Sequence, residues 1–243
     1  MCGIFGAVGS YYNGAKTLDL NLISHRGPDA KDYFDFKDNK VLLGHTRLAI
    51  IDINDRANQP MHSSCGRFVI IYNGEIFNYL ELKSELEKIG VFFNTKSDTE
   101  VILNGFIEFG YNFFSKLNGM FAICIHDKTK NKTIILRDEK GIKPLYIKST
   151  IDGILFSSEI KPILSYNNEK PTFNEDALVR HLAYNFSPGS KTLFKGINKV
   201  EPGTIINFYK NRFEINKIKN LKNSSFKKVY FKKIKQELDE HLN

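Results

Sequence analysis

Residues 120–125 read Met-Phe-Ala-Ile-Cys-Ile, a short stretch in which positions of both parities are apolar. A strand with this pattern must be covered on both of its faces. A turn signal follows at Lys128–Lys132, and apolar residues resume at Thr133–Leu136, which is the spacing of a β-hairpin with antiparallel strands. Buried antiparallel strands accompanied by a few helices predict an α+β layered sandwich.

Other stretches of the chain share this strand-like character. They are short, rich in β-branched and aromatic residues, and bounded by Gly, Asn or Asp. We expect strands at Ile4–Val8, Val41–Leu43, Leu48–Ile51, Phe68–Tyr72, Ile154–Phe156 and Thr204–Phe208.

Two helix starts are marked by residues that commonly cap helices. Asn78 is followed by Glu81, and Ser97 is followed by Glu100, which is the spacing of a capping box. These signals predict helices from Asn78 to about Ile89 and over Thr99–Phe109, with weaker helical patterns at Ala15–Ile23 and Glu175–Tyr184.

The chain changes character near Lys217. Residues 217–243 carry eight lysines against three acidic residues, so they hold +5 of the chain's net charge of +8. Apolar residues at four-residue spacing predict a charged helix with a narrow apolar stripe, made by Phe226, Tyr230, Ile234, Leu238 and Leu242. We therefore expect one domain over residues 2–218, followed by a basic linker and helix over residues 219–243.

Composition excludes several classes of function. The remaining charge is not interleaved with aromatic residues, so we expect no nucleic-acid partner. No run approaches the roughly 20 apolar residues of a membrane-spanning helix, and the N-terminus lacks the basic region of a secretory signal. The cysteines at positions 2, 65 and 124 form no CxxC, and the six histidines show no metal-ligand spacing. These observations predict a soluble, cytoplasmic protein without a metal site.

Cys2 follows the initiator Met1 directly. Removal of Met1 would leave Cys2 with both a thiol and a free α-amine, whose reference pKa of about 7.7–8.0 lies near neutrality. Such an amine can take the proton of the thiol, so Cys2 is a candidate N-terminal nucleophile. The alternative is an ordinary small apolar residue at the start of a strand.

Three further segments carry polar residues at predicted strand or helix ends. Asn73 and Gly74 follow an apolar strand, where an amide and a glycine N–H could hold an oxyanion, although Asn-Gly is also a common hairpin turn. Arg47 lies between apolar stretches and could bind a carboxylate through two parallel hydrogen bonds. Asp98 could bind an ammonium group or help to start a helix.

Together these residues form a set that resembles a known family. The start Cys2-Gly3-Ile4-Phe5-Gly6, with GHTRLAIID at 44–52, YNGEIFNY at 72–79 and SDTE at 97–100, is similar to the class II glutamine amidotransferases. These are N-terminal-nucleophile hydrolases that release ammonia from glutamine. The resemblance narrows to the asparagine synthetase branch through HRGPD at 25–29, LNGMFAICIHD at 117–127, RDEKGIKPLYI at 137–147 and SSEIKPIL at 157–164.

The resemblance covers residues 2 to about 210 and implies both a fold and a site. The fold would be a four-layer αββα sandwich of two mostly antiparallel sheets. By the resemblance, Cys2 is the nucleophile, and Asn73 with the Gly74 N–H forms the oxyanion hole. The amino-acid end of the substrate, L-glutamine, would be held by Arg47, Glu75 and Asp98, aided by the backbone of Leu48, Ala49, Ile50 and Ile51.

The resemblance also implies what accompanies the reaction. Glutamine hydrolysis in this family needs no metal or cofactor. Asparagine synthetases continue into an ATP-using domain with an SGGxDS motif, which this sequence does not contain. ATP and Mg²⁺ would therefore enter only through a synthetase domain or a separate synthetase chain. A second copy of this chain, in a homodimer, is a further candidate partner. The ammonia would serve asparagine synthesis from aspartate. Two alternatives stay open, namely a sugar or peptide acceptor and a non-catalytic regulatory or interaction remnant.

Overall fold

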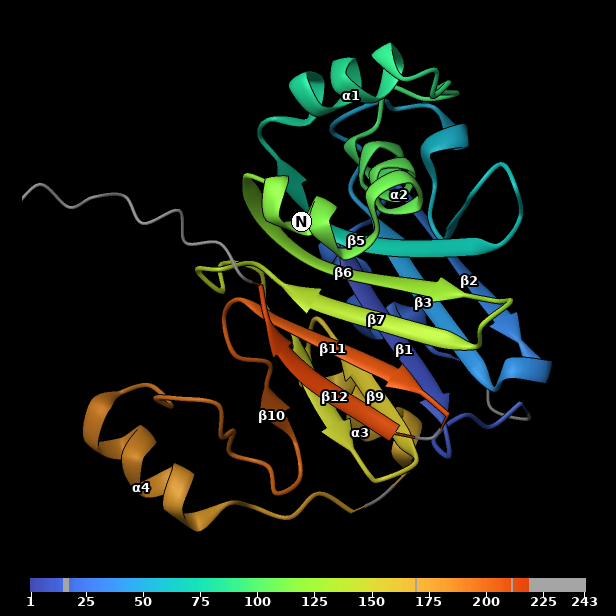
Figure 1. Cartoon of the computed structure of the whole chain (residues 1–243). Coiled ribbons are helices and arrows are strands. Elements are labelled where there is room, and N and C mark those ends of the chain that lie inside the picture. Colours follow the sequence, from blue (N-terminus) through green and yellow to red (C-terminus); the bar gives the residue numbers. More distant parts are fainter. Residues whose placement is uncertain (15–17, 169, 211, 219–243) are drawn as a thin grey trace, which may run out of the picture.

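The computed structural model describes the chain apart from residues 15–17, 169, 211 and 219–243. Two six-stranded antiparallel sheets are stacked on one another (Figure 1). Sheet A has the order β10-β8-β9-β1-β3-β2, and its strands are β1 (Gly3–Gly9), β2 (Ala30–Phe36), β3 (Val41–Arg47), β8 (Tyr146–Ser149), β9 (Gly153–Ser157) and β10 (Asn198–Lys199). Sheet B has the order β12-β11-β7-β6-β5-β4, and its strands are β4 (Met61–His62), β5 (Phe68–Ile76), β6 (Gly119–Asp127), β7 (Lys132–Arg137), β11 (Thr204–Tyr209) and β12 (Arg212–Lys217).

Helices cover the outer faces of the two sheets. The α-helices are α1 (Tyr79–Lys88), α2 (Asp98–Phe109), α3 (Ile160–Asn167) and α4 (Glu175–Tyr184). Short 3₁₀ helices are η1 (Leu20–Arg26), η2 (Lys37–Asn39), η3 (Asp55–Ala57) and η4 (Gly110–Lys116). Helices α1, α2 and η4 pack on sheet B, and α3 packs on sheet A. The predicted four-layer αββα sandwich is therefore confirmed.

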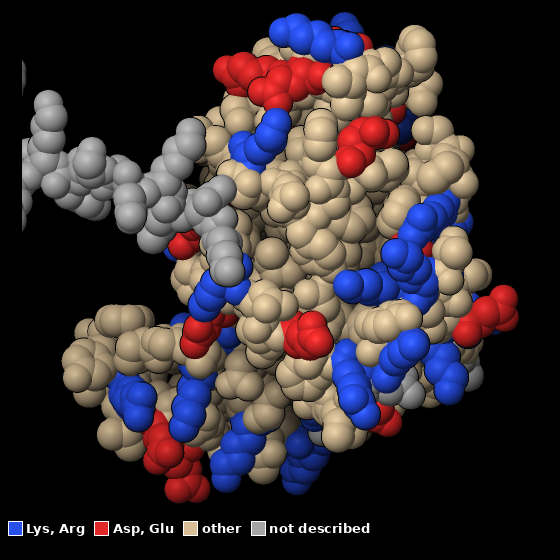
Figure 2. All heavy atoms as spheres, viewed as in Figure 1, with Lys and Arg blue, Asp and Glu red and all other residues tan. Residues whose placement is uncertain are grey.

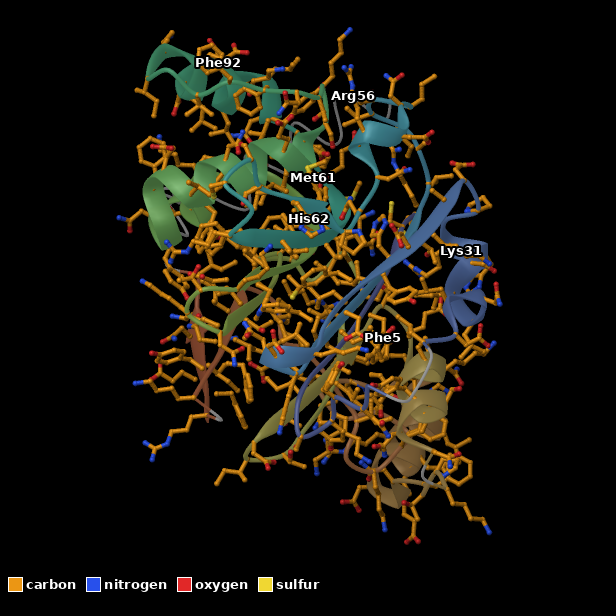
Figure 3. All side chains as sticks on the ribbon, turned by 90° about the vertical axis from the view of Figure 1, so that its right-hand side faces the viewer. Phe5, Lys31, Arg56, Met61, His62 and Phe92 are labelled. Carbon is orange, nitrogen blue, oxygen red and sulfur yellow. The ribbon has the colours of Figure 1, made fainter. Side chains whose placement is uncertain are left out.

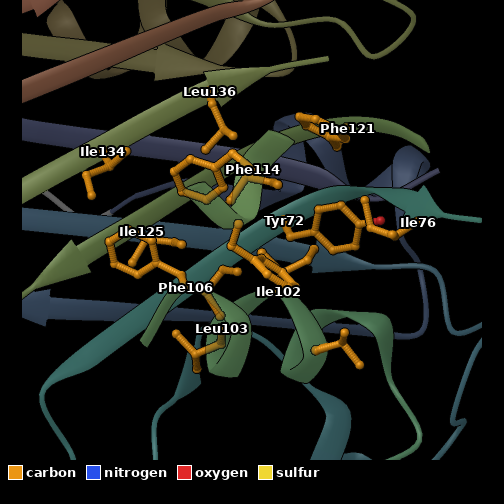
Figure 4. Close-up of a cluster of buried hydrophobic side chains, with 14 of the residues drawn as sticks. Tyr72, Ile76, Ile102, Leu103, Phe106, Phe114, Phe121, Ile125, Ile134 and Leu136 are labelled. Carbon is orange, nitrogen blue, oxygen red and sulfur yellow. The ribbon is translucent and has the colours of Figure 1, made fainter. Parts of the chain in front are cut away.

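Strand β6 shows why the layers form. Its residues Phe121, Ile123 and Ile125 point into the cluster beneath α2, whereas Ala122 and Cys124 point into the core between the two sheets. Both faces of the strand are thus covered, as its apolar sequence predicts. Figure 4 shows the outer cluster, in which side chains of sheet B meet those of α2 and η4. The rings of Phe106 and Phe114 stack there with centroids 5.4 Å apart.

One strand prediction is wrong and the others are confirmed within a few residues. Leu48–Ile51 is not a strand, because β3 ends at Arg47 and the chain turns into a loop. The Arg47 guanidinium donates hydrogen bonds to carbonyl groups of that loop, so the loop curls around the side chain instead of continuing the sheet. Strands β2, β8 and β12 lack a signal in the sequence analysis, because half-exposed or exposed residues interrupt their apolar pattern.

The helix predictions need three corrections. Ser97 caps α2 by accepting from the Thr99 N–H, but Glu100 does not complete a capping box, because its carboxylate accepts from Asn94 and Thr95 instead. Asn78 precedes α1 without a side-chain cap, since its amide bridges to Lys116 and Asn118. The pattern at Ala15–Ile23 corresponds to η1 and not to an α-helix, as far as the described residues extend. Helix α4 is confirmed at the predicted bounds.

Helix α4 projects from the body that the two sheets form (Figure 1). Helix α4 lies away from the stacked sheets (Figure 1), and its Val179 and Leu182 side chains are exposed. In the side view, Phe5 lies in the interior and Phe92 at the outer end of the molecule (Figure 3). Lys and Arg side chains on the face in Figure 2 are scattered among Asp and Glu side chains. Within the described residues, no helix is long and apolar enough to cross a membrane. The apolar stripe predicted over Phe226–Leu242 lies outside the described residues.

Candidate active site

The predicted site residues come from four separate elements and meet at one pocket. Cys2 leads into β1, Arg47 ends β3, Asn73 lies near the end of β5, and Asp98 opens α2. The pocket has a volume of about 220 Å³. Nine of the ten predicted residues line it, namely Cys2, Arg47, Leu48, Ile50, Ile51, Asn73, Gly74, Glu75 and Asp98. Ala49 does not line the pocket, and its N–H donates to the Asp29 carboxylate at 2.8 Å.

Cys2 is held through both its side chain and its main chain. The Leu48 N–H donates to the Cys2 sulfur at 3.4 Å, and the Arg26 Nε donates to the Cys2 carbonyl at 3.1 Å. Burial raises the pKa of the Cys2 thiol, against the opposing influence of the Leu48 N–H, the N-terminal ammonium and Arg47. A thiol with a raised pKa stays protonated at neutral pH, so the sulfur needs a base before it can act as a nucleophile.

The open edge of β5 presents a main-chain donor to the pocket. Strand β4 pairs only with Val69 and Ile70, so the later part of β5 has no strand partner on that side within the described residues. The Tyr72 N–H donates to Gln59 Oε1 at 2.6 Å, and the Ile76 N–H donates to Asp98 Oδ2 at 3.1 Å. Alternate residues of a strand direct their N–H groups to the same edge. The Gly74 N–H therefore lies on this edge between two bonded donors, at a residue that lines the pocket.

Gly74 and Asn73 each offer an N–H donor that has no partner among the described residues. A Cβ at Gly74 would lie 2.2 Å from the Met120 carbonyl oxygen, so the strand admits only glycine without a backbone shift. Asn73 is only 1% exposed, and within the described residues neither its Nδ2 nor its Oδ1 has a hydrogen-bond partner. Buried amides normally have partners, so the unpaired amide of a residue that lines this pocket needs an explanation. Asn73-Gly74 is part of a strand, and the hairpin-turn alternative is wrong.

Arg47 shapes the wall of the pocket. Its Nη1 donates to the Asn54 carbonyl at 3.0 Å and to Asn58 Oδ1 at 2.7 Å, and its Nη2 donates to the carbonyl groups of Ile51 and Asp52. The planar guanidinium thus fixes the loop that supplies Leu48, Ile50 and Ile51 to the pocket. The sequence predicted the position of Arg47 at the pocket but not these bonds to the loop.

Asp98 gives the pocket a buried negative charge. Its Oδ2 accepts the Tyr72 hydroxyl at 2.8 Å as well as the Ile76 N–H. Burial raises the pKa of the Asp98 carboxyl, hydrogen bonds from Tyr72 and Ile76 oppose the rise, and the nearby Glu75 adds to it. Two carboxylates beside one pocket favour a cationic group between them, such as an α-ammonium.

The structure adds pocket residues that the sequence analysis did not single out. They are Met1, Ala57, Gln59, Tyr72, Ser97, Thr99, Met120 and Lys143. Lys143 is buried, and burial lowers the pKa of its ammonium group. Its loop is fixed by the Asp138 carboxylate, which accepts the N–H groups of Lys140, Ile142 and Lys143. Lys143 lies within a stretch that carries the family resemblance, but a lysine gives no hydropathy signal for burial. Within the described residues, no cluster of His, Cys, Asp or Glu could hold a metal ion.

A four-layer sandwich with Cys2 at the head of the inner strand β1, beside a pocket that Cys2 lines, is the fold of the N-terminal-nucleophile hydrolases. The chain belongs to the glutamine amidotransferase family, because the sequence model of the glutamine amidotransferase domain matches residues 1–219. It is 35% identical over 254 residues to a putative glutamine-hydrolysing asparagine synthetase 2 of Methanocaldococcus jannaschii, over 96% of this chain and 49% of that protein. It is 39% identical over 212 residues to the glutamine-hydrolysing asparagine synthetase 1 of Bacillus subtilis, over 84% of this chain and 33% of that protein.

The chain therefore spans between a third and a half of the length of these relatives, and it is a glutamine amidotransferase domain of the asparagine synthetase type. Among solved structures, the glutamine phosphoribosylpyrophosphate amidotransferase of B. subtilis has a TM-score of 0.63 and 21% identity, over 89% of this chain and 49% of that one. This likeness supports the fold. The class expected from the sequence is confirmed.

Proposed function

We propose that the protein hydrolyses L-glutamine to L-glutamate and ammonia through a γ-glutamyl thioester on Cys2. One observation carries the proposal. Three residues line the same pocket, namely Cys2, Gly74, whose N–H lies on the open edge of β5, and Asn73, whose amide has no partner among the described residues. A nucleophile beside two convergent donors is the arrangement that acyl transfer requires.

The proposed reaction starts with removal of Met1. The α-amine of Cys2 takes the thiol proton. A base is needed because burial raises the pKa of this thiol. The thiolate attacks the γ-carbonyl carbon, and the developing oxyanion accepts hydrogen bonds from Asn73 and Gly74. The ammonium group of Cys2 protonates the departing nitrogen and the C–N bond breaks. Ammonia departs, and the γ-glutamyl thioester on Cys2 remains. Water, deprotonated by the same amine, attacks the thioester, and the thiol is released with glutamate. No step uses a metal or cofactor.

The substrate's amino-acid end would lie at the opposite wall of the pocket. We assign its α-ammonium to the carboxylates of Asp98 and Glu75, whose combined charge favours a cation there. Its α-carboxylate would lie near Arg47 and the main chain that follows it. Because four loop oxygens already engage the guanidinium, Arg47 acts on the substrate chiefly through the loop that it fixes.

The acceptor of the ammonia belongs to the proposal as well. The relatives carry additional chain beyond the part that this protein matches, and their names describe asparagine synthesis. We propose that a synthetase domain or chain, using ATP and Mg²⁺, transfers the ammonia to aspartate. Combining the protein with L-glutamine, aspartate, ATP, Mg²⁺ and the synthetase part of the M. jannaschii relative would test this assignment, with asparagine as the measured product.

Glutamine hydrolysis is tested on the protein alone. Purified protein should release glutamate from glutamine, and Cys2→Ala should abolish the release while the circular dichroism spectrum and melting temperature stay unchanged. A reactive glutamine analogue should label Cys2 and spare Cys65 and Cys124, the first exposed and the second buried in β6. Mass analysis that finds Met1 retained in fully active protein would exclude the amine as base. Absence of glutamate release would support a non-catalytic module instead.

A further inference from the structure

Tyr72 immediately precedes the two proposed oxyanion donors, and three side chains hold it in place. Gln59 Oε1 accepts its N–H at 2.6 Å, His45 Nε2 lies 3.1 Å from its carbonyl oxygen, and Asp98 Oδ2 accepts its hydroxyl at 2.8 Å. These side chains come from a loop, from β3 in the other sheet and from α2. Each is buried, so water does not compete for these bonds. Tyr72 is thus fixed from three directions.

These bonds replace a missing strand. Beyond Ile70, β5 has no strand partner on this side among the described residues. The main-chain groups of Tyr72 face that open edge, where an unpaired amide or carbonyl would be unfavourable in a buried setting. The side chains of Gln59 and Asp98 accept the N–H groups of Tyr72 and Ile76. The N–H of Gly74, which lies between them on the same edge, is left to bond a ligand in the pocket.

The imidazole of His45 makes one hydrogen bond among the described residues, to the Tyr72 carbonyl oxygen. Complete burial lowers the pKa of the His45 imidazole to about 3, so the ring is neutral at physiological pH. A neutral imidazole carries one N–H, and a carbonyl oxygen only accepts, so the proton lies on Nε2. Within the described residues, Nδ1 has no partner. Gln59 is held at its other end, because its Nε2 donates to Thr99 Oγ1 at 3.2 Å.

We propose that His45 and Gln59 are positioning residues of the oxyanion hole, an inference that rests on the glutaminase function proposed above. They fix the peptide planes on both sides of Tyr72 and thereby set the directions of the Asn73 amide and the Gly74 N–H. Neither side chain donates to the oxyanion. Loss of either bond lets this edge of β5 shift, and misplacement of about 1 Å can cost a rate of roughly 10²-fold.

The test uses a removal and a rescue at His45. His45→Phe keeps a flat ring but loses the donor, and we expect kcat for glutamine hydrolysis to fall about 10- to 100-fold with KM within about twofold. His45→Gln restores an N–H donor at similar reach and should recover most of kcat. Gln59→Met retains the length of the side chain but loses the acceptor, so it should lower kcat in the same way.

A matched control separates positioning from stability. His126 is also fully buried and neutral, with a pKa lowered by burial to about 4, but it does not line the pocket. His126→Phe should lower the melting temperature and leave kcat unchanged. Alkylation of Cys2 by iodoacetamide, which does not use an oxyanion hole, should proceed at the wild-type rate in all folded variants.

The outcomes are distinguishable. If folded His45→Phe and Gln59→Met both retain wild-type kcat, or if His45→Gln is as slow as His45→Phe, the positioning inference is wrong while the glutaminase function stands. A failure of His45→Phe to fold would leave the decision to Gln59→Met and His45→Gln. A wild-type protein that does not hydrolyse glutamine would overturn the proposed function and this inference with it.

Discussion

Asn73→Ala should make the protein slower without making it less stable. The Asn73 amide is 1% exposed, and within the described residues both of its polar atoms lack partners. An unsatisfied buried polar group costs about 1–3 kcal/mol of folding free energy, and alanine removes that cost. The lost volume opens into the existing pocket instead of creating a sealed cavity, so the opposing packing loss is small. We expect the free energy of unfolding to rise by roughly 0–2 kcal/mol, which is about 0–6 °C in melting temperature for a chain of this size.

The catalytic effect of the same change has the opposite sign. Removal of one oxyanion donor costs about 10²–10³-fold in kcat, or roughly 3–4 kcal/mol of transition-state stabilisation. KM should change little, because the amide acts mainly on the charge that develops during the reaction. Steady-state glutamate release and thermal unfolding of the same preparation give the two readouts. A fall in melting temperature of more than about 4 °C, or an effect confined to KM, would refute the assignment of Asn73.

Asn39 provides the matched control for Asn73→Ala. Its amide is satisfied, since Nδ2 lies 3.2 Å from His126 Nε2 and donates to the Lys128 carbonyl at 2.9 Å. Asn39→Ala therefore loses hydrogen bonds and should destabilise the fold by about 1–3 kcal/mol, with kcat unchanged. The two substitutions should move stability and activity in different directions.

Two other perturbations address the binding loop and the buried histidines. Arg47→Lys loses the planar fork that spans the loop oxygens, so KM for glutamine should rise at least about tenfold with kcat within about threefold; a fall in kcat alone would place Arg47 in the chemistry. Acid should destabilise the fold below about pH 6.5, because the unfolded chain binds protons there while burial holds the pKa of His45 at about 3 and that of His126 at about 4. Each contributes a slope of about 1.4 kcal/mol per pH unit down towards its folded pKa. Folded His126→Gln should lose about 1 kcal/mol per pH unit of the measured slope between pH 6 and 4.5 in denaturant titrations, and an unchanged slope would contradict the lowered pKa of His126.

The sequence predicts the layers of this fold well because β6 and its neighbours are apolar on both faces. It also selects residues that share one pocket, since nine of the ten predicted site residues, Cys2 among them, line it, whereas their catalytic and binding roles stay predictions. It fails at Leu48–Ile51, where an apolar run is a loop, because the hydrogen bonds of the Arg47 guanidinium to that loop leave no trace in hydropathy. It also fails at Glu100, whose carboxylate has a nearby alternative in the Thr95 N–H at 2.7 Å. In both cases a polar side chain bonds to partners that only the folded chain brings within reach.

Gln59, His45 and Lys143 show a further limit. Single-residue patterns identify groups that could touch a substrate, but these three act on the main chain or lie in a wall contributed by distant segments. The contacts of Gln59 and His45 with Tyr72 lie at an edge of β5 that is open because β4 stops pairing at Ile70, a property of two strands and not of one. A sheet that continued across this edge would satisfy every N–H of β5 and leave none for catalysis. The proposed oxyanion hole therefore requires a short β4 as well as Gly74. Extending β4 with residues of high β-propensity should abolish glutamine hydrolysis while raising the free energy of unfolding.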